Sequence, residues 1–161
     1  MSVLAGDRKE AKQEPITYSV ELRAMLTELA NRDFGVKDLD QLVRIRYANG
    51  IDKREDFGRY RGMMREERDR IKDLCYLLTN NLRAANSIYP TTMREYERRR
   101  EFQSFGIVNC EQLIKELQYI IELFNVDVSV YERCTKAISR EIELIKKWRQ
   151  RDNRIKSYLK G

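Results

Sequence analysis

The chain has 161 residues, of which 36% are charged and 42% hydrophobic, with only seven glycines and two prolines. This composition argues against a turn-rich sandwich or barrel and favours long solvated helices, in one domain with an extension. No stretch approaches the roughly 20 apolar residues of a membrane span, and histidine, the commonest general base and metal ligand, is absent. We therefore expect an all-α cytoplasmic protein with no membrane contact, catalytic residue, metal or cofactor.

The formal net charge of +6 lies entirely in the last sixteen residues, where seven basic side chains accompany one acid, Asp152. The preceding residues carry 25 basic and 25 acidic side chains, so the body of the protein is neutral. A concentrated cationic end on a neutral body indicates a polyanionic partner.

Residues 1–15 are polar, show no periodicity and end in Pro15, so we expect a disordered tail. Residues 16–50 show two short apolar helical patterns, one stopping near Phe34 and Gly35 and one covering Leu39–Ile45. These patterns predict a short helical extension that precedes the main domain.

Residues 51–161 predict an antiparallel helical bundle with a basic carboxyl-terminal end. Three long amphipathic patterns run over 52–87, 92–124 and about 129–156, separated by short connections at Tyr89–Pro90 and 125–128. Long helices joined by short connections pack antiparallel, which predicts an up-down bundle of the four-helix type. Cys75, Cys110 and Cys134 fall within the apolar stripes, so we expect buried thiols rather than ligands.

The segment KKWRQRDNRIK, residues 146–156, is the main candidate site. Cations along a helix can follow a phosphate backbone, and a tryptophan can stack on an unpaired base. The alternative is that these cations complement the helix dipole while Trp148 closes the core, and for Trp148 we favour the core. The predicted nucleic-acid contacts in this segment are Lys146, Lys147, Arg149, Arg151, Arg154 and Lys156.

A second basic run, Arg94, Arg98, Arg99 and Arg100, opens the helix predicted over 92–124, and its candidate contacts are Arg98, Arg99 and Arg100. Neighbouring acids can neutralise it, so it becomes a candidate contact only if it lies beside the carboxyl-terminal cations. The mixed segment 59–72 alternates in charge sign and predicts an ordinary solvated face. Carboxylate pairs such as Glu66 with Glu67 and Glu141 with Glu143 do not share a helix face, which disfavours metal or phosphoryl-transfer chemistry.

Three stretches resemble the accessory variability determinant family, four-helix-bundle proteins encoded beside the reverse transcriptase of diversity-generating retroelements. They are LCYLLTNNLRAANSIYP (74–90), NCEQLIKELQYIIELFNV (109–126) and EIELIKKWRQRDNRIK (141–156), the last an apolar helix with a tryptophan that runs into a basic end. The likeness covers about residues 55–160. It implies a homo-oligomer, specifically a pentamer, that binds the reverse transcriptase and its template RNA and supports mutagenic cDNA synthesis without doing chemistry itself.

The leading hypothesis is therefore a non-catalytic RNA- or DNA-binding accessory subunit of a reverse transcriptase. The alternative is a structural or regulatory interaction bundle of a mobile element or phage, whose cations dock on an acidic protein surface. The two hypotheses differ in whether RNA displaces the partner of the cationic end.

Overall fold

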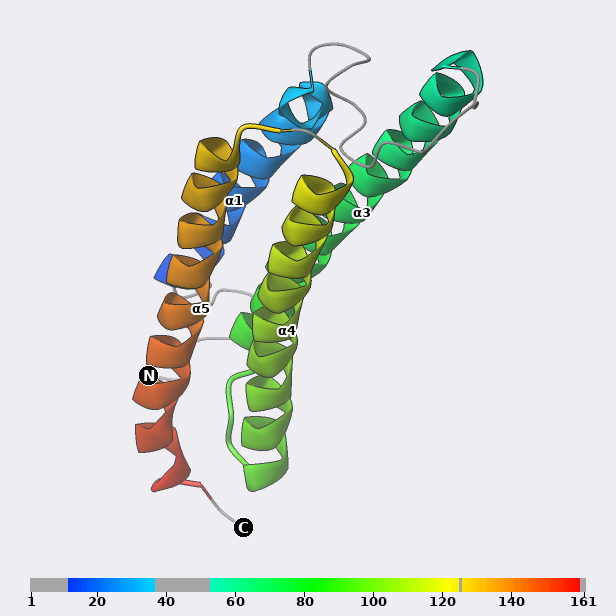
Figure 1. Cartoon of the computed structure of the whole chain (residues 1–161). Coiled ribbons are helices and arrows are strands. Elements are labelled where there is room, and N and C mark those ends of the chain that lie inside the picture. Colours follow the sequence, from blue (N-terminus) through cyan, green and yellow to red (C-terminus); the bar gives the residue numbers. More distant parts are fainter. Residues whose placement is uncertain (1–11, 37–52, 125, 160–161) are drawn as a thin grey trace.

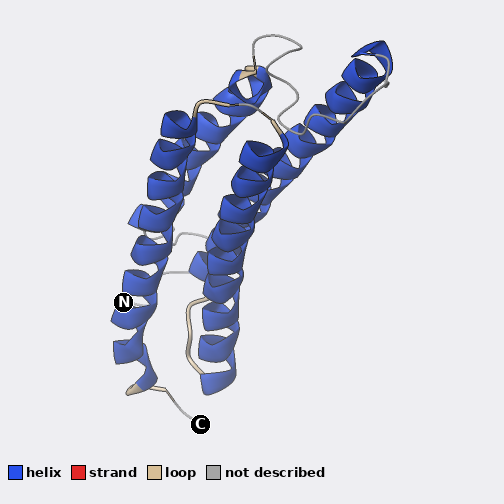
Figure 2. Cartoon of the chain, viewed as in Figure 1, coloured by secondary structure: helices blue, strands red, loops and turns tan. Residues whose placement is uncertain are grey.

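The computed structural model describes residues 12–36, 53–124 and 126–159, and in these ranges the chain is helical with short connections (Figures 1 and 2). The elements are α1 (Glu14–Asn31), the 3₁₀ turn η2 (Asp33–Gly35), α3 (Lys53–Ser87), α4 (Met93–Leu123) and α5 (Val128–Lys156). Successive long helices run in opposite directions, which confirms the predicted all-α up-down bundle. None of the helices in these ranges combines the length and apolar composition that crossing a bilayer requires.

The helix α1 is the short amino-terminal helix predicted within 16–50, and it is a member of the bundle. It packs against both α3 and α5, so that α1, α3, α4 and α5 contact one another in a closed ring. Leu22 and Leu26 of α1 are fully buried in the common core, and the Ser19 hydroxyl lies 3.0 Å from that of Thr79 on α3. An amphipathic helix must bury its apolar face, and α1 does so in the gap between α3 and α5.

The helix α1 includes Glu14 and Pro15, so the last two residues of the tail predicted over 1–15 are helical. Proline lacks an N–H that the first helical turn would leave unsatisfied, so it begins this helix rather than ending the segment before it. Residues 1–11 and the short helix predicted over 39–45 lie outside the described residues.

The three later helices begin and end close to their predicted positions, and at α4 and α5 a side chain caps the first turn. Thr92 precedes α4, and its hydroxyl accepts a hydrogen bond from the Glu95 N–H at 3.2 Å. Asp127 does the same for α5 through the Ser129 N–H at 3.0 Å. These side chains satisfy backbone donors that have no partner within the helix.

The core is formed by the predicted apolar stripes. Ile71, Cys75, Leu78 and Leu82 of α3 face Cys110, Leu113 and Leu117 of α4 and Cys134, Ile138 and Ile145 of α5, all at most 3% exposed. The three cysteines are reduced and buried, as predicted.

The far end of the bundle, where α1 ends, is closed by a strained turn. Phe34 has a left-handed φ of 57°, and its ring is fully buried. The Tyr131 hydroxyl donates to the Phe34 carbonyl at 2.7 Å, and Arg68 donates to the Ala30 carbonyl at 3.2 Å. These contacts compensate the backbone strain and satisfy carbonyls at the end of α1.

Candidate nucleic-acid interface

The antiparallel packing of α4 and α5 brings the two predicted basic runs to the same end of the bundle. This end also holds the α3–α4 connection and the end of α5 (Figure 1). The condition set for the second basic run is therefore met: the start of α4 lies beside the carboxyl-terminal cations.

Arg99 does not belong to the exposed surface, which corrects its assignment as a nucleic-acid contact. Its guanidinium donates to both carboxylate oxygens of Asp152, at 2.8 and 3.0 Å, and to the Ile88 carbonyl at 3.0 Å. Gln103 gives Asp152 a third donor at 2.8 Å. The Arg99 side chain is only 9% exposed, so it joins α4, α5 and the α3–α4 connection instead of facing solvent.

Trp148 is a core residue, as favoured from the sequence. It is 1% exposed, and the Arg99 guanidinium lies over its ring at 5.2 Å from the centroid. Its indole is therefore part of the packing around Arg99 and Asp152, and it offers no face to an unpaired base.

The six predicted cations of α5 lie around the solvent-facing sides of this buried strip. Lys146, Lys147, Arg151, Arg154 and Lys156 are exposed, while Arg149 is half-buried. Lys146 has one exposed ion pair with Glu143 at 3.7 Å, and Arg151 donates to the amide oxygen of Gln13 at 3.4 Å. Within the described ranges, no carboxylate lies at ion-pair distance from the other four.

There is a structural reason why most of the α5 cations have no carboxylate beside them in the described ranges. Asp152 is the one acid among the last sixteen residues, and its carboxylate points inward to Arg99. The outward cations therefore keep their positive field, which decays only over about 10 Å at 0.1 M salt.

Arg100 and Arg149 meet at the seam between α4 and α5. Burial, and next the positive charge of Arg100, lower the pKa of Arg149, so the two guanidiniums repel one another. Arg100 Nη1 donates to the Tyr96 hydroxyl and to the Asn153 amide oxygen, both at 3.2 Å, which fixes it beside α5. In the part of the chain that the structure describes, neither guanidinium has a carboxylate at ion-pair distance, so the two can bind a phosphate together.

Arg98 lies on another side of α4, over the Phe102 ring at 6.0 Å from the centroid. Because Arg98 is two residues from Tyr96, these two side chains do not lie on the same face of the helix. Of the second basic run, the structure thus brings Arg100 to the α5 cations, buries Arg99 and leaves Arg98 exposed elsewhere on α4.

Sequence reasoning missed the polar residues that organise this end, namely Tyr96, Gln103 and Asn153. Their signal is weak, because each is a single polar position on an otherwise mixed helix. Tyr96 and Arg99 are three residues apart and Gln103 is four residues further, which is the spacing of one helix face. That spacing could have predicted a polar seam facing α5.

The three cysteines have raised thiol pKa values. Burial raises the pKa of Cys75 to about 12 and also raises the pKa values of Cys110 and Cys134, which keeps these thiols protonated. No group of three potential metal ligands occurs in the described ranges.

Two buried acids remain outside the cationic end. Burial, and then Glu14, raise the pKa of Glu141 to about 8, and burial together with Glu116 raises that of Glu67 to about 7. Glu67 thus lies beside a second carboxylate, Glu116, and Glu141 lies near Cys110, a thiol that burial keeps protonated.

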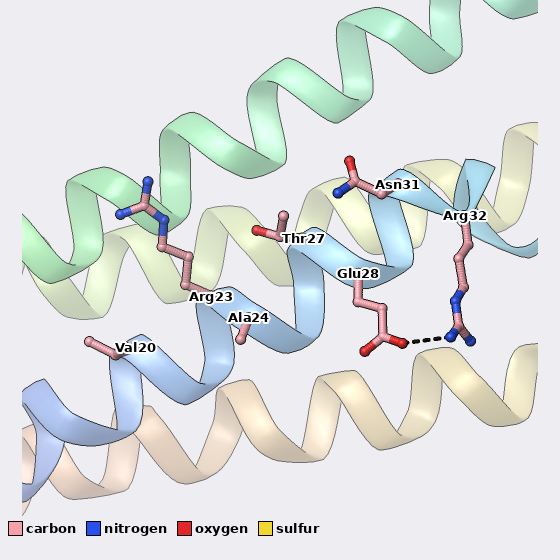
Figure 3. A pocket seen from close by; sticks show the side chains of 7 residues that line it. All are labelled: Val20, Arg23, Ala24, Thr27, Glu28, Asn31 and Arg32. Atoms are coloured by element: carbon pink, nitrogen blue, oxygen red, sulfur yellow. Dashed lines mark ion pairs between the residues drawn. The ribbon is translucent and has the colours of Figure 1, made fainter.

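The other hollows are open surface features. One of about 610 Å³ runs along the outer side of α1, where Ala24 and Thr27 are short and Glu28 pairs with Arg32 at 2.7 Å (Figure 3). Another, of about 360 Å³, lies between the start of α1 and α5 and is lined by Arg140, Lys147 and Arg151 as well as Glu14 and Glu143. Because both basic and acidic side chains line this hollow, we regard it as the edge of the cationic end and not as a separate site.

Fold and surface together define the class of an all-α four-helix bundle with a cationic end. No family model, curated protein or solved structure matches the chain. The functional argument therefore depends on the geometry of the cationic end.

Proposed function

We propose that the protein is a non-catalytic nucleic-acid-binding protein that captures phosphates with its cationic end. We define this surface as Arg100 of α4 with Lys146, Lys147, Arg149, Arg151, Arg154 and Lys156 of α5. The observation that carries the proposal is that Asp152 is paired with Arg99, at 2.8 Å, so that among the described residues only Lys146 of this surface has a carboxylate, Glu143, at ion-pair distance.

The arrangement suits a polyanion better than a single small anion. The six cations of α5 span positions 146 to 156, about 15 Å of helix axis at 1.5 Å per residue. Successive phosphates of a strand lie several ångströms apart, so several can be engaged together and their counterions released.

The first test is the salt dependence of RNA and DNA binding, measured by fluorescence anisotropy. If five to seven cations engage phosphate, the log–log slope of affinity against salt is roughly −4 to −6. Binding that does not change with salt contradicts the proposal.

The second test reverses charge on the surface. The triple variant Arg149→Glu, Arg151→Glu, Arg154→Glu should lose nucleic-acid binding and keep its helical circular dichroism. The matched control is Lys115→Glu, Arg133→Glu, Lys136→Glu, which makes the same change in charge at exposed positions nearer the other end of the bundle. Equal loss in both triple variants would show that only net charge matters, and the assigned surface would be wrong.

We further propose that this binding serves a reverse transcriptase, in line with the resemblance to the accessory variability determinant family, and that the protein acts as a homo-oligomer, a pentamer. Native mass spectrometry measures the copy number. Co-purification with the reverse transcriptase encoded nearby, lost on nuclease treatment or charge reversal, tests the partner. A partner retained in excess RNA or heparin would instead favour the alternative, a protein-interaction bundle whose cations dock on an acidic surface.

A further inference from the structure

Two arginines that lack an acidic partner among the described residues meet across the seam between α4 and α5. Arg100 of α4 donates from Nη1 to the Tyr96 hydroxyl and to the Asn153 amide oxygen, both at 3.2 Å. Asn153 lies four residues after Arg149, so these two side chains share one face of α5. Burial, and next the charge of Arg100, lower the pKa of Arg149, so the two guanidiniums lie within electrostatic reach of one another. We call these four residues, Tyr96, Arg100, Arg149 and Asn153, the seam site.

The seam site contains more hydrogen-bond donors than the protein itself uses. Arg149 is half-buried, its Nε is shielded from solvent, and it donates to none of the described residues. For Arg100, Nη1 is the one nitrogen with an acceptor in those ranges. Asn153 accepts through its amide oxygen from Arg100 and Tyr96, which leaves its amide nitrogen as a further donor. Buried donors need acceptors, and a bound anion would supply them.

The charge of the seam site matches a phosphate monoester. Neither arginine has a carboxylate at ion-pair distance in the described ranges, and Asp152, beside Asn153, is paired with Arg99. The site therefore has two uncompensated positive charges. An internal phosphodiester of a strand carries one negative charge. A phosphate monoester carries about −1.5 to −2 at pH 7 and has three acceptor oxygens, so it can accept from both guanidiniums at once.

We propose that the seam site binds the phosphate monoester at the end of a nucleic-acid strand, while the other cations of α5 contact internal phosphates. This inference rests on the proposed function and names the part of the ligand that the seam site recognises. A monoester occurs in a nucleic acid only at a strand end. Arg154 and Lys156 lie about 7.5 and 10.5 Å further along the axis of α5 than Arg149, so they can contact the phosphates that follow.

The experiment compares the ends of one single-stranded sequence of about 20 nucleotides, prepared as RNA and as DNA. The strand carries a 5′-phosphate, a 3′-phosphate or hydroxyls at both ends. Each unlabelled strand competes with a fluorescein-labelled reference strand, so that no label covers the end under test. The wild-type protein should bind at least one phosphorylated strand roughly tenfold more tightly than the hydroxyl strand, because charged hydrogen bonds are gained only at the phosphorylated end.

Single substitutions separate the seam site from the general positive charge of the surface. Arg100→Gln and Arg149→Gln each remove one charge of the site and should reduce the preference for a phosphorylated end to about twofold or less. The matched control is Arg154→Gln, which removes an exposed cation of the same helix outside the seam site. This control should weaken the binding of all three strands by a similar factor and retain the preference. Circular dichroism verifies that each variant keeps its helices.

Inorganic phosphate distinguishes a strand end from free phosphate as the occupant. At an ionic strength matched with sodium chloride, it should compete with the phosphorylated end and reduce the preference of the wild-type protein. If inorganic phosphate raises the Tm of the wild-type protein but not that of Arg100→Gln, while the three strands bind alike, the site takes free phosphate and the inference is wrong.

The failure of this inference is distinguishable from the failure of the proposed function. Equal affinity for the three strands, with binding that still weakens as salt rises, would overturn recognition of the strand end and leave phosphate capture standing. A preference that persists in both Arg100→Gln and Arg149→Gln would show that the end is recognised outside the seam site. Absence of binding to every strand at low salt would overturn both proposals.

Discussion

The middle and the end of α5 each bury one carboxylate, and the two sites differ in their partners. Glu141 is 0% exposed, and neither of its oxygens has a hydrogen-bond partner in the described ranges. Asp152, three turns later, is 6% exposed and accepts three hydrogen bonds from Arg99 and Gln103. The same helix therefore carries an acid that burial drives toward the neutral form and an acid held in an ion pair.

The comparison explains why the end of α5 is cationic. A buried ionised group needs a partner, and Arg99 from α4 supplies it to Asp152. The exposed cations of α5 are then left without the acid that is nearest to them in sequence. Asp152 therefore links stability to the proposed function. Its ion pair with Arg99 stabilises the end of the bundle, and the same pairing keeps its negative charge away from the exposed cations.

The largest expected effect comes from removing Asp152. Asp152→Ala leaves the Arg99 guanidinium buried without its carboxylate, which should lower the free energy of unfolding by about 3–5 kcal/mol. Urea denaturation followed by circular dichroism measures the loss. Asp73→Ala, at an exposed position on α3, is the control and should change stability by less than about 0.5 kcal/mol.

Removing both charges separates the cost of an orphaned arginine from the value of the pair. In the double variant Arg99→Met, Asp152→Leu, much of the stability should return, because two apolar side chains can replace a buried ion pair. A loss below about 1 kcal/mol in Asp152→Ala would show that Arg99 finds solvent or another partner, and the comparison with Glu141 would then fail.

Glu141 should make stability fall as pH rises. The folded protein holds a proton on Glu141 up to about pH 8, whereas the unfolded chain releases it near the ordinary pKa of 4.5, so stability is lost progressively between these values. Charged or polar groups that face it are Glu14 and Tyr18 of α1 and Cys110 of α4. Glu141→Gln should flatten this dependence and gain about 2–4 kcal/mol at pH 9.

Denaturation curves at pH 5, 7 and 9 measure this effect (roughly the two limits and the middle of the titration). Glu132→Gln, at an exposed position on the same helix, is the control. A wild-type protein whose stability is constant over this range would mean that Glu141 has an unseen partner or reaches solvent.

Glu67 tests the same effect of burial on the pKa of a carboxyl group. The expected effect is smaller, because one carboxylate oxygen of Glu67 already accepts a hydrogen bond. Its carboxylate accepts from Arg70 at 2.7 Å, while burial and the nearby Glu116 raise its pKa to about 7. Glu116→Gln should remove the like charge, lower the pKa of Glu67 and stabilise the protein by about 1 kcal/mol at pH 8. Carboxyl titration by NMR measures the shift, and Glu111→Gln, exposed on the same helix, should leave it unchanged.

Much of the fold could be predicted from the sequence because periodicity and capping are local. The stripe through Ile71, Cys75 and Leu78 lies in the core, and Thr92 and Asp127 begin their helices. Phe105 of α4, which matches the apolar spacing as well, is 44% exposed. Spacing alone does not reveal which edge of a wide stripe has a neighbouring helix.

The pairings between helices were not predictable in the same way. Asp152 and Arg99 are 53 residues apart, and either could have been a surface residue by type and spacing. Only the antiparallel arrangement shows that they meet, and that Arg100 stands beside Arg149 while Arg98 does not. The position of α1 within the bundle likewise depends on the gap between α3 and α5, which no single segment encodes.

The smallest effect should come from the exposed acid of α5. Glu143 lies 3.7 Å from Lys146, and both side chains are more than half exposed, so Glu143→Gln should change the free energy of unfolding by less than about 0.5 kcal/mol. The same change removes a negative charge next to the cationic surface and should tighten nucleic-acid binding by roughly two- to threefold at low salt. Anisotropy titrations measure this gain, with Glu132→Gln as the control. If Glu143→Gln does not change the affinity for nucleic acid, the bound nucleic acid does not contact Lys146. The interface would then be confined to the last two turns of α5, beside Arg100.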